Sequence, residues 1–282
     1  MSDTLRFPPL SLAALTVLEL APAAMVQCAA DAGYASVGLR LIPATAHEPR
    51  HDLVGDTPTV REVARVLADT GVSVLDVEIL RLEPQTDVDH YRAALETGAR
   101  LGARFALVAG NDPDEARLVE RFAALCDLAA PLGLALALEP MPWTDVRTFG
   151  DGLRVVARAG RDNACVLVDA IHFDRGGGRL AELAAAPRSR LRYVQLCDAP
   201  AQRPRDLDTL LHQARAERLM PGDGGLELEG MLAALPPGLP VSLEVPMRTL
   251  AATMPAVERA RRLRAKTEAL LARVAEHAPG PA

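Results

Sequence analysis

Short, apolar, β-rich runs alternate along this chain with longer Ala-, Leu- and Arg-rich stretches that have the period of a helix. Runs such as ALALE and ACVLVD are apolar without interruption, which is typical of strands in a parallel sheet that helices cover on both faces. The predicted strands lie at 11–15, 36–42, 72–82, 105–111, 134–141, 164–173, 191–198 and 241–245, and the predicted helices at 23–32, 59–70, 88–101, 113–130, 151–159, 179–185, 228–235 and 253–275.

Eight strand–helix units with no break in composition predict one domain, residues 1–282, folded as a single (β/α)8 TIM barrel. A doubly wound open sheet is the alternative, because local patterning does not show whether a sheet closes on itself. Neither a GxGxxG motif nor a phosphate-binding loop directly follows a predicted strand, so the sequence carries no nucleotide-binding signature.

Several helix ends are marked by local signals. The segment Asn111-Asp112-Pro113-Asp114-Glu115 combines a capping side chain, a proline and acidic residues, which is typical of a helix start. Glycine in the left-handed conformation commonly ends a helix. Glycines stand between a helical stretch and a strand at Gly33, Gly71, Gly102, Gly133 and Gly160.

The charged residues exclude two classes of function. The 31 basic and 37 acidic residues give a formal net charge of −6, which disfavours a nucleic-acid partner, because such partners are bound by clustered Lys and Arg. Lys266 is the only lysine and lies in the predicted last helix. A Schiff-base aldolase needs a buried, desolvated lysine, so that chemistry is excluded.

The four cysteines stand singly, without CxxC spacing, and therefore predict reduced thiols rather than a zinc cluster or a disulfide framework. The segment MSDTLRFPPL lacks a basic stretch followed by a long apolar run. We therefore expect a cytoplasmic protein that does not associate with membranes.

Four consecutive predicted strands each end in a polar residue: Glu139 in LALALEP, Asp169 in VLVDAIH, Gln195 in YVQLCD and Glu244 in VSLEVP. The carboxyl ends of barrel strands point into one mouth. Three carboxylates converging there would repel one another unless a cation neutralised them. One divalent metal ion is the simplest explanation. An all-oxygen ligand set favours Mg²⁺ or Mn²⁺, with Co²⁺ or Zn²⁺ as substitutes.

Other candidates for the substrate pocket lie on neighbouring predicted strands and loops. Arg40, Glu78 and Asn111 lie in strands two to four, where each would either line the mouth or form a buried ion pair. Trp143 follows Glu139 closely and would either floor the pocket or pack in the core.

These motifs, in their order and spacing, resemble the xylose isomerase-like barrel superfamily in its sugar isomerase/epimerase branch. The resemblance covers essentially the whole chain. It implies a metal-dependent isomerase or epimerase whose usual ligands are Glu, Asp, His and Glu. Gln195 departs from that set, and glutamine at this place resembles the 3-dehydroshikimate dehydratases of the same superfamily. The segments that carry the resemblance are Glu139–Pro140, Asp169–His172, Gln195–Asp198, Arg218–Gly224 and Glu244.

Two further residues match motifs of this superfamily. His172 matches the histidine of DxxH and would either cap a strand end or transfer a proton as a neutral imidazole. Arg218 matches the arginine of RxxPGxG and would either form an exposed salt bridge or bind a substrate hydroxyl or carboxylate.

The resemblance implies a small polyhydroxy ketone, free or phosphorylated, as substrate. Glu139 and Glu244 would remove and return a proton through an enediolate, which gives isomerisation or epimerisation. If a hydroxyl β to the carbonyl leaves instead, the outcome is a dehydratase reaction with His172 as general acid or base.

Two other functions and a possible subunit interface also have to be considered. An apurinic endonuclease of the endonuclease-four type needs a cluster of histidines for three metals, whereas this chain has six histidines in all. A non-catalytic sugar-binding barrel would be expected to lack ligands, whereas all four ligand positions here carry oxygen donors. The closing helix, which contains RARRLRAK, either covers the barrel or reaches a second subunit in a homodimer.

Overall fold

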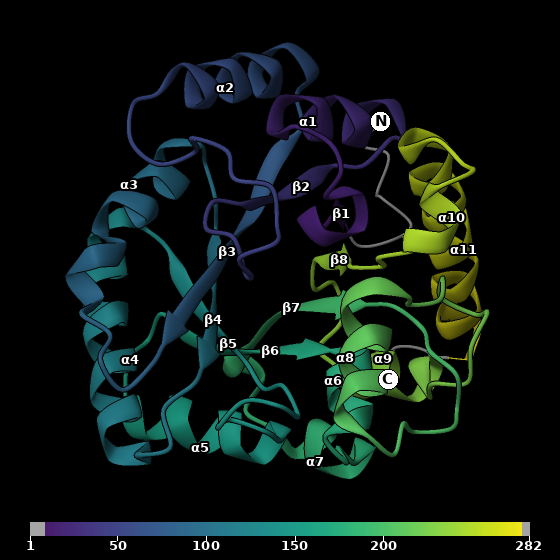
Figure 1. The fold of residues 1–282 in the computed structure, drawn as a ribbon. Coiled ribbons are helices and arrows are strands. Elements are labelled where there is room, and N and C mark those ends of the chain that lie inside the picture. Colours follow the sequence, from purple (N-terminus) through teal and green to yellow (C-terminus); the bar gives the residue numbers. More distant parts are fainter. Residues whose placement is uncertain (1–8, 278–282) are drawn as a thin grey trace, which may run out of the picture.

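The eight strands form one closed barrel, in which every neighbouring pair is parallel (Figure 1). Closure is set by β1, in which Ser11 pairs with Ser36 of β2 on one side and with Ser242 of β8 on the other. The computed structural model describes residues 9–277. The prediction of a (β/α)8 TIM barrel is confirmed and the open sheet is excluded. The strands are β1 Leu10–Leu12, β2 Ser36–Arg40, β3 Ser73–Leu82, β4 Phe105–Gly110, β5 Ala135–Glu139, β6 Ala164–Asp169, β7 Leu191–Leu196 and β8 Val241–Leu243.

The helices surround the barrel, and the long last helix lies beside the first (Figure 1). They are α1 Pro22–Asp31, α2 Pro58–Thr70, α3 Arg92–Arg100, α4 Glu115–Ala129, α5 Phe149–Ala159, α6 Ala170–Arg175, α7 Leu180–Ala185, α8 Leu207–Ala216, α9 Leu228–Ala234, α10 Arg248–Ala251 and α11 Ala256–His277. Short 3-10 helices lie at η1 Ala14–Val17, η2 Val88–Tyr91, η3 Ala130–Leu132 and η4 Arg188–Arg190.

Helix α5 shows how local sequence fixes an element. The Thr148 side chain accepts a hydrogen bond from the backbone N–H of Asp151, and the Asp151 side chain accepts one from the N–H of Thr148. This reciprocal capping box satisfies two N–H groups that the first turn leaves unpaired. The helix ends at Gly160, whose φ of 62° lies in the left-handed region that favours glycine.

The predicted strand at 164–173 is too long, because β6 ends at Asp169 and α6 begins at once. The Oδ1 of Asp169 accepts hydrogen bonds from the backbone N–H groups of Ile171 and His172 at 2.9 and 3.1 Å. A carboxylate that caps two N–H groups starts a helix. His172 therefore lies in the first turn of α6, and its predicted place at a strand end is wrong.

The first predicted strand is also too long. β1 ends at Leu12, and the next turn is the 3-10 helix η1. The helices α6, α8 and α10, which the sequence did not predict, have six, ten and four residues. Length alone does not explain this, because α7 and α9, with six and seven residues, were predicted.

The barrel interior is apolar at one end and polar at the other. The lower layers contain the stacked rings of Phe105 and Tyr193, whose centroids are 4.5 Å apart. Side chains alternate along a strand, so Ala135 and Ala137 of β5 point inward and Glu139, two residues further on, does the same. The same alternation carries polar side chains to the carboxyl ends of the other strands, and this end of the barrel holds the site.

The described cysteines are all buried and free, which agrees with the prediction of reduced thiols. Within residues 9–277, no helix has the length and apolar character needed to cross a membrane. The single domain over 1–282, the cytoplasmic location and the homodimer stay predictions.

Candidate metal and active site

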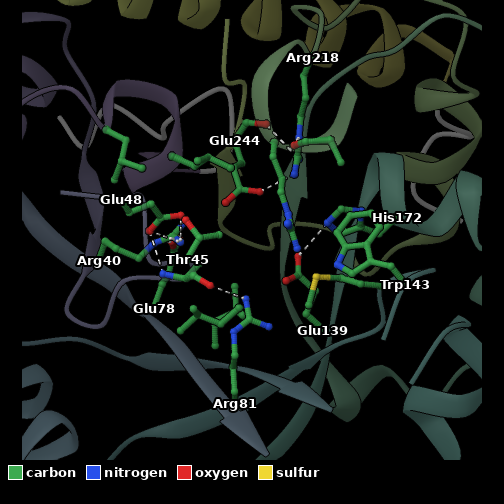
Figure 2. Close-up of a pocket in the computed structure, with 18 of the residues that line it drawn as sticks. Arg40, Thr45, Glu48, Glu78, Arg81, Glu139, Trp143, His172, Arg218 and Glu244 are labelled. Atoms are coloured by element: carbon green, nitrogen blue, oxygen red, sulfur yellow. Dashed lines mark hydrogen bonds and ion pairs between the residues drawn. The ribbon is translucent and has the colours of Figure 1, made fainter. Parts of the chain in front are cut away.

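A cavity opens at the carboxyl end of the barrel, with an empty volume of about 820 Å³ counted to its mouth. We call it the site cavity. Figure 2 shows side chains from opposite parts of the barrel directed into it. Predicted site residues that line it are Arg40, Glu78, Glu139, Trp143, His172, Arg218 and Glu244.

Arg218 bridges two of the predicted metal ligands. Its Nη1 lies 2.6 Å from Oδ2 of Asp169, and its Nη2 lies 2.8 Å from Oε2 of Glu244. Its Nε donates to the backbone carbonyl of Ala214 at 2.7 Å. The residue is only 3% exposed, so it forms a buried salt bridge and not the exposed one considered from the sequence. Its other predicted role, in substrate binding, stays a prediction.

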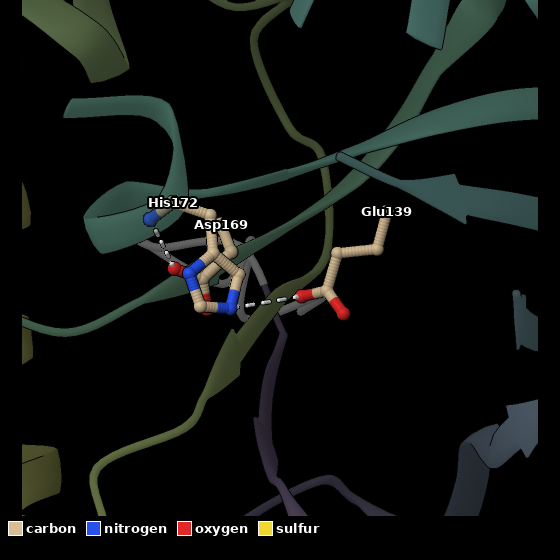
Figure 3. A group of neighbouring side chains, drawn as sticks. All are labelled: Glu139, Asp169 and His172. Atoms are coloured by element: carbon tan, nitrogen blue, oxygen red, sulfur yellow. Dashed lines mark hydrogen bonds and ion pairs between the residues drawn. The ribbon is translucent and has the colours of Figure 1, made fainter. Parts of the chain in front are cut away.

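Glu139 and His172 form a second contact on the wall of the site cavity. The His172 Nε2 lies 3.7 Å from Oε1 of Glu139 (Figure 3). Ligand atoms of Glu139, Asp169 and His172 all lie within 4.8 Å of one another, so these three side chains could hold a metal ion. The Trp143 ring meets the His172 ring edge-on, with centroids 4.9 Å apart, and fixes its orientation.

Burial and mutual repulsion shift the pKa values of these acids. Burial, reinforced by Glu244 and Asp169, holds the pKa of Glu139 well above its usual range. Burial also raises the pKa of Glu244 to about 7, although Arg218 opposes the rise. For Asp169, burial would raise the pKa, but the charge of Arg218 and the hydrogen bonds outweigh it and the pKa is lowered.

Burial lowers the pKa of His172 to about 4, so its imidazole is neutral near pH 7.

The donor set fits a divalent cation. Glu139, Asp169 and Glu244 carry three negative charges when ionised, and Arg218 neutralises one, which leaves two. Among residues 9–277, the Oε1 of Glu139 and both polar atoms of the Gln195 side chain are buried without a hydrogen-bond partner. Buried polar atoms of this kind are costly unless something binds them. A divalent ion would neutralise the remaining charge and occupy these oxygens.

Gln195 lies directly beside Asp169, because the two are register partners across β6 and β7. It is fully buried below the residues that line the site cavity. His172 is a further candidate ligand, whereas sequence analysis had considered it only as a strand-end cap or a proton-transfer residue. The spacing of Asp169 and His172 could have indicated a shared metal site, since residues three apart lie on one side of a helical turn.

The remaining predicted residues, Arg40, Glu78 and Asn111, are described by their contacts with each other and with Arg81. Arg40 lies 2.9 Å from Oε2 of Glu78 and 3.2 Å from Oε2 of Glu48, so Arg40 and Glu78 form a buried ion pair and also line the site cavity. Asn111 is not among the residues that line the site cavity, and its Oδ1 accepts a hydrogen bond from Arg81 at 3.2 Å.

Sequence analysis missed Arg81 and Arg215, which also line the site cavity. Glu78, Ile79 and Arg81 of β3 all line the site cavity, so strict alternation from the predicted Glu78 would have placed Arg81 on the other face of the strand. Arg215 lies on α8, a helix that the sequence pattern did not predict.

Comparison with known proteins shows the family to which the chain belongs. The family model described as xylose isomerase-like TIM barrel matches residues 26–270. A 3-dehydroshikimate dehydratase from Pseudomonas aeruginosa is 30% identical over 216 residues, which are 69% of this chain and 33% of that protein. An inosose isomerase from Halalkalibacterium halodurans is 31% identical over 116 residues, which are 39% of this chain and 38% of that protein. The chain spans about a third of the length of these curated relatives.

Solved structures share the fold. The IolI protein, crystallised with a bound zinc atom, superposes with a TM-score of 0.79 at 19% identity, over 94% of this chain and 99% of that one. A D-allulose 3-epimerase from Methylomonas sp., solved with D-allulose, superposes with a TM-score of 0.67 at 20% identity, over 95% of this chain and 97% of that one. The resemblance inferred from the sequence motifs is confirmed: the chain belongs to the xylose isomerase-like TIM barrel family.

Proposed function

We propose that this protein is a divalent-metal-dependent enzyme that moves a proton on a small polyhydroxy ketone, as sugar isomerases and epimerases do. One observation carries the proposal. Three buried carboxylates meet beside a neutral imidazole at the mouth of the barrel, with one guanidinium to compensate them. The relatives named as isomerase, dehydratase and epimerase support an enzyme of this kind.

Glu139, Asp169, Gln195 and Glu244 would hold the metal, with His172 at its side. A bound Mg²⁺ or Mn²⁺ would act as a Lewis acid that polarises a substrate carbonyl and so acidifies the neighbouring C–H. Mg²⁺ and Mn²⁺ suit a set of carboxylate and amide oxygens. Zinc, which the IolI structure contains, is the alternative that nitrogen from His172 would favour.

The chain's own residues can perform the proton transfers. Glu139 and Glu244 come from β5 and from the end of β8, so they approach a molecule in the site cavity from different sides (Figure 2). Each carboxylate, when ionised, can accept a proton from a neighbouring C–H. One would take the proton from carbon, leaving the electron pair on the carbonyl oxygen as an enediolate. The other would return a proton to the same or the neighbouring carbon.

A dehydratase acting on 3-dehydroshikimate is the second candidate. Gln195, where the family's usual set has histidine, favours it, and so does the relative of that name that matches 69% of this chain. In that reaction the same enolate would expel a β-hydroxyl as water, with His172 as the proton donor.

A deuterium-exchange assay tests the shared step. Metal-loaded protein is incubated in D₂O with D-fructose, an inosose or 3-dehydroshikimate. We expect NMR to show deuterium next to the carbonyl of at least one of them, and a chelator to abolish the exchange. Ultraviolet absorbance of the aromatic product, protocatechuate, would identify the dehydratase. Protein that demonstrably holds its metal and exchanges no proton on any of the three contradicts the enzyme proposal.

His172→Asn is expected to keep its metal and to lose about 10²- to 10⁴-fold in turnover, the range for one general acid or base. Metal content is measured by elemental analysis and turnover by the exchange assay. Full turnover in this variant would refute the proton-transfer role. Loss of the metal itself would assign His172 to the ligands instead.

A further inference from the structure

Two arginines in the site cavity, Arg81 and Arg215, form no ion pair with a carboxylate among residues 9–277. Both line the cavity and both are partly buried. In contrast, Arg40 and Arg218 each bridge two carboxylates in the same cavity. Of the five arginines that line the cavity, Arg40 and Arg218 are therefore committed to the protein's own acids, Arg81 and Arg215 are partly buried without such a partner, and Arg248 is exposed.

Arg81 is held in place with hydrogen-bonding capacity to spare. Its Nη1 donates to Oδ1 of Asn111 at 3.2 Å, and its Nη2 donates to the backbone carbonyl of Ala44 at 3.3 Å. A guanidinium has five N–H donors, so these two bonds orient the group and leave others for a ligand. Figure 2 shows Arg81 directed toward the same space as Glu139.

Arg215 lies beside the proposed reaction residues. Its guanidinium carbon lies 5.4 Å from the centroid of the Trp143 ring, a cation–π contact. The same ring also meets the His172 ring edge-on, and His172 Nε2 lies 3.7 Å from Oε1 of Glu139. The Trp143 ring therefore contacts both the Arg215 guanidinium and the His172 ring, so a group bound at Arg215 would lie near the acid–base residues.

Burial and a neighbouring guanidinium lower the pKa of each of the two arginines. Burial, followed by repulsion from Arg81, lowers the pKa of Arg215. Burial, followed by repulsion from Arg40, lowers the pKa of Arg81. Partly buried cations that repel each other are costly in the free protein, and a bound anion would relieve both costs.

We propose that Arg81 and Arg215 bind an anionic substituent of the substrate, a carboxylate or a phosphate, and hold the rest of the molecule against Glu139 and His172. The inference rests on the proposed function and narrows its substrate from polyhydroxy ketones in general to those with an acidic group. Two guanidiniums match the planar, multidentate geometry of these oxyanions.

Calorimetric binding to the metal-loaded protein tests this without turnover. Two matched pairs of probes are used, shikimate with its methyl ester and fructose 6-phosphate with fructose. The first pair tests a carboxylate and the second a phosphate. We expect the charged member of one pair to bind at least about 10-fold tighter than its neutral partner, because hydrogen bonds to charged groups are the stronger ones.

Arg81→Met and Arg215→Met should each weaken binding of that charged probe about 10- to 100-fold and leave its neutral partner unaffected. Arg65→Met is the matched control, since Arg65 lies exposed on α2 and pairs with Asp69. Equal binding within both pairs, or equal losses in the Arg65 control, would overturn the inference. Circular dichroism and thermal melting of each variant exclude misfolding as the cause.

The deuterium-exchange assay separates this inference from the function on which it rests. Arginine-dependent binding of a charged probe without proton exchange on any ketone would refute the proposed function and leave the anion site standing. Exchange on 3-dehydroshikimate or fructose 6-phosphate, the charged ketones, that is unchanged in Arg81→Met and Arg215→Met would refute the anion site and leave the function standing.

Discussion

Glu139→Gln is expected to lower kcat/KM about 10³-fold or more. Glutamine has nearly the same shape but cannot accept a proton, and loss of a general base costs about 10²- to 10⁴-fold. The Oε1 of Glu139 is buried and has no hydrogen-bond partner among residues 9–277, so this oxygen is free for a substrate proton or a metal. Turnover is measured by deuterium exchange on whichever ketone the wild-type protein accepts.

Metal content decides what the loss means. If Glu139→Gln retains its metal under excess Mn²⁺ and stays inactive, Glu139 acts as the base. If activity returns as the metal concentration rises, Glu139 acts mainly as a ligand. Glu62→Gln is the control, because Glu62 is exposed on α2. Wild-type exchange rates in Glu139→Gln would contradict both roles.

Arg218→Met is expected to lower the free energy of unfolding by about 3–5 kcal/mol, the usual cost of removing one partner from a buried ion pair. Arg218 is 3% exposed, and it holds Asp169 and Glu244 at 2.6 and 2.8 Å. Without it, these two carboxylates stay buried near Glu139 with no compensating charge. Urea denaturation of metal-free protein measures the difference.

The same variant connects stability to the proposed metal. Arg65→Met, on the protein surface, should change stability by less than about 0.5 kcal/mol. A divalent ion should restore more stability to Arg218→Met than to the wild-type protein, because the variant has one more uncompensated negative charge to neutralise. A loss below about 1 kcal/mol would show that the carboxylates take up protons and need no cation.

Much of the barrel could be predicted from local sequence. The uninterrupted apolar run of β5, the capping box at Thr148 and Asp151, and the left-handed Gly160 each act within a few residues. The four strand-end residues from Glu139 to Glu244 were also identifiable, because alternation along a strand decides which side chains point inward. Family motifs added His172 and Arg218.

Other parts of the site depended on contacts that local sequence does not record. The backbone N–H groups of Ile171 and His172 donate to the Asp169 side chain. Helix α6 therefore begins where the sequence predicted the end of a strand, and His172 lies in its first turn. Arg218 could be seen as a family arginine, but its burial between Asp169 and Glu244 could not, since those partners are 49 and 26 residues away. Arg215 was missed because helix α8, on which it lies, was not predicted.

The sequence by itself determined that strands and helices alternate along this chain, with acids and an amide at the strand ends, because periodicity and capping are local properties. Only the tertiary structure decided which charges meet. Closure between β1 and β8 and the register between β6 and β7 bring together residues far apart in the chain. Because Coulomb energies depend on distance in space, the pairing of Arg218 and Arg40 with acids, and the lack of such partners for Arg81 and Arg215 among residues 9–277, follow from the fold.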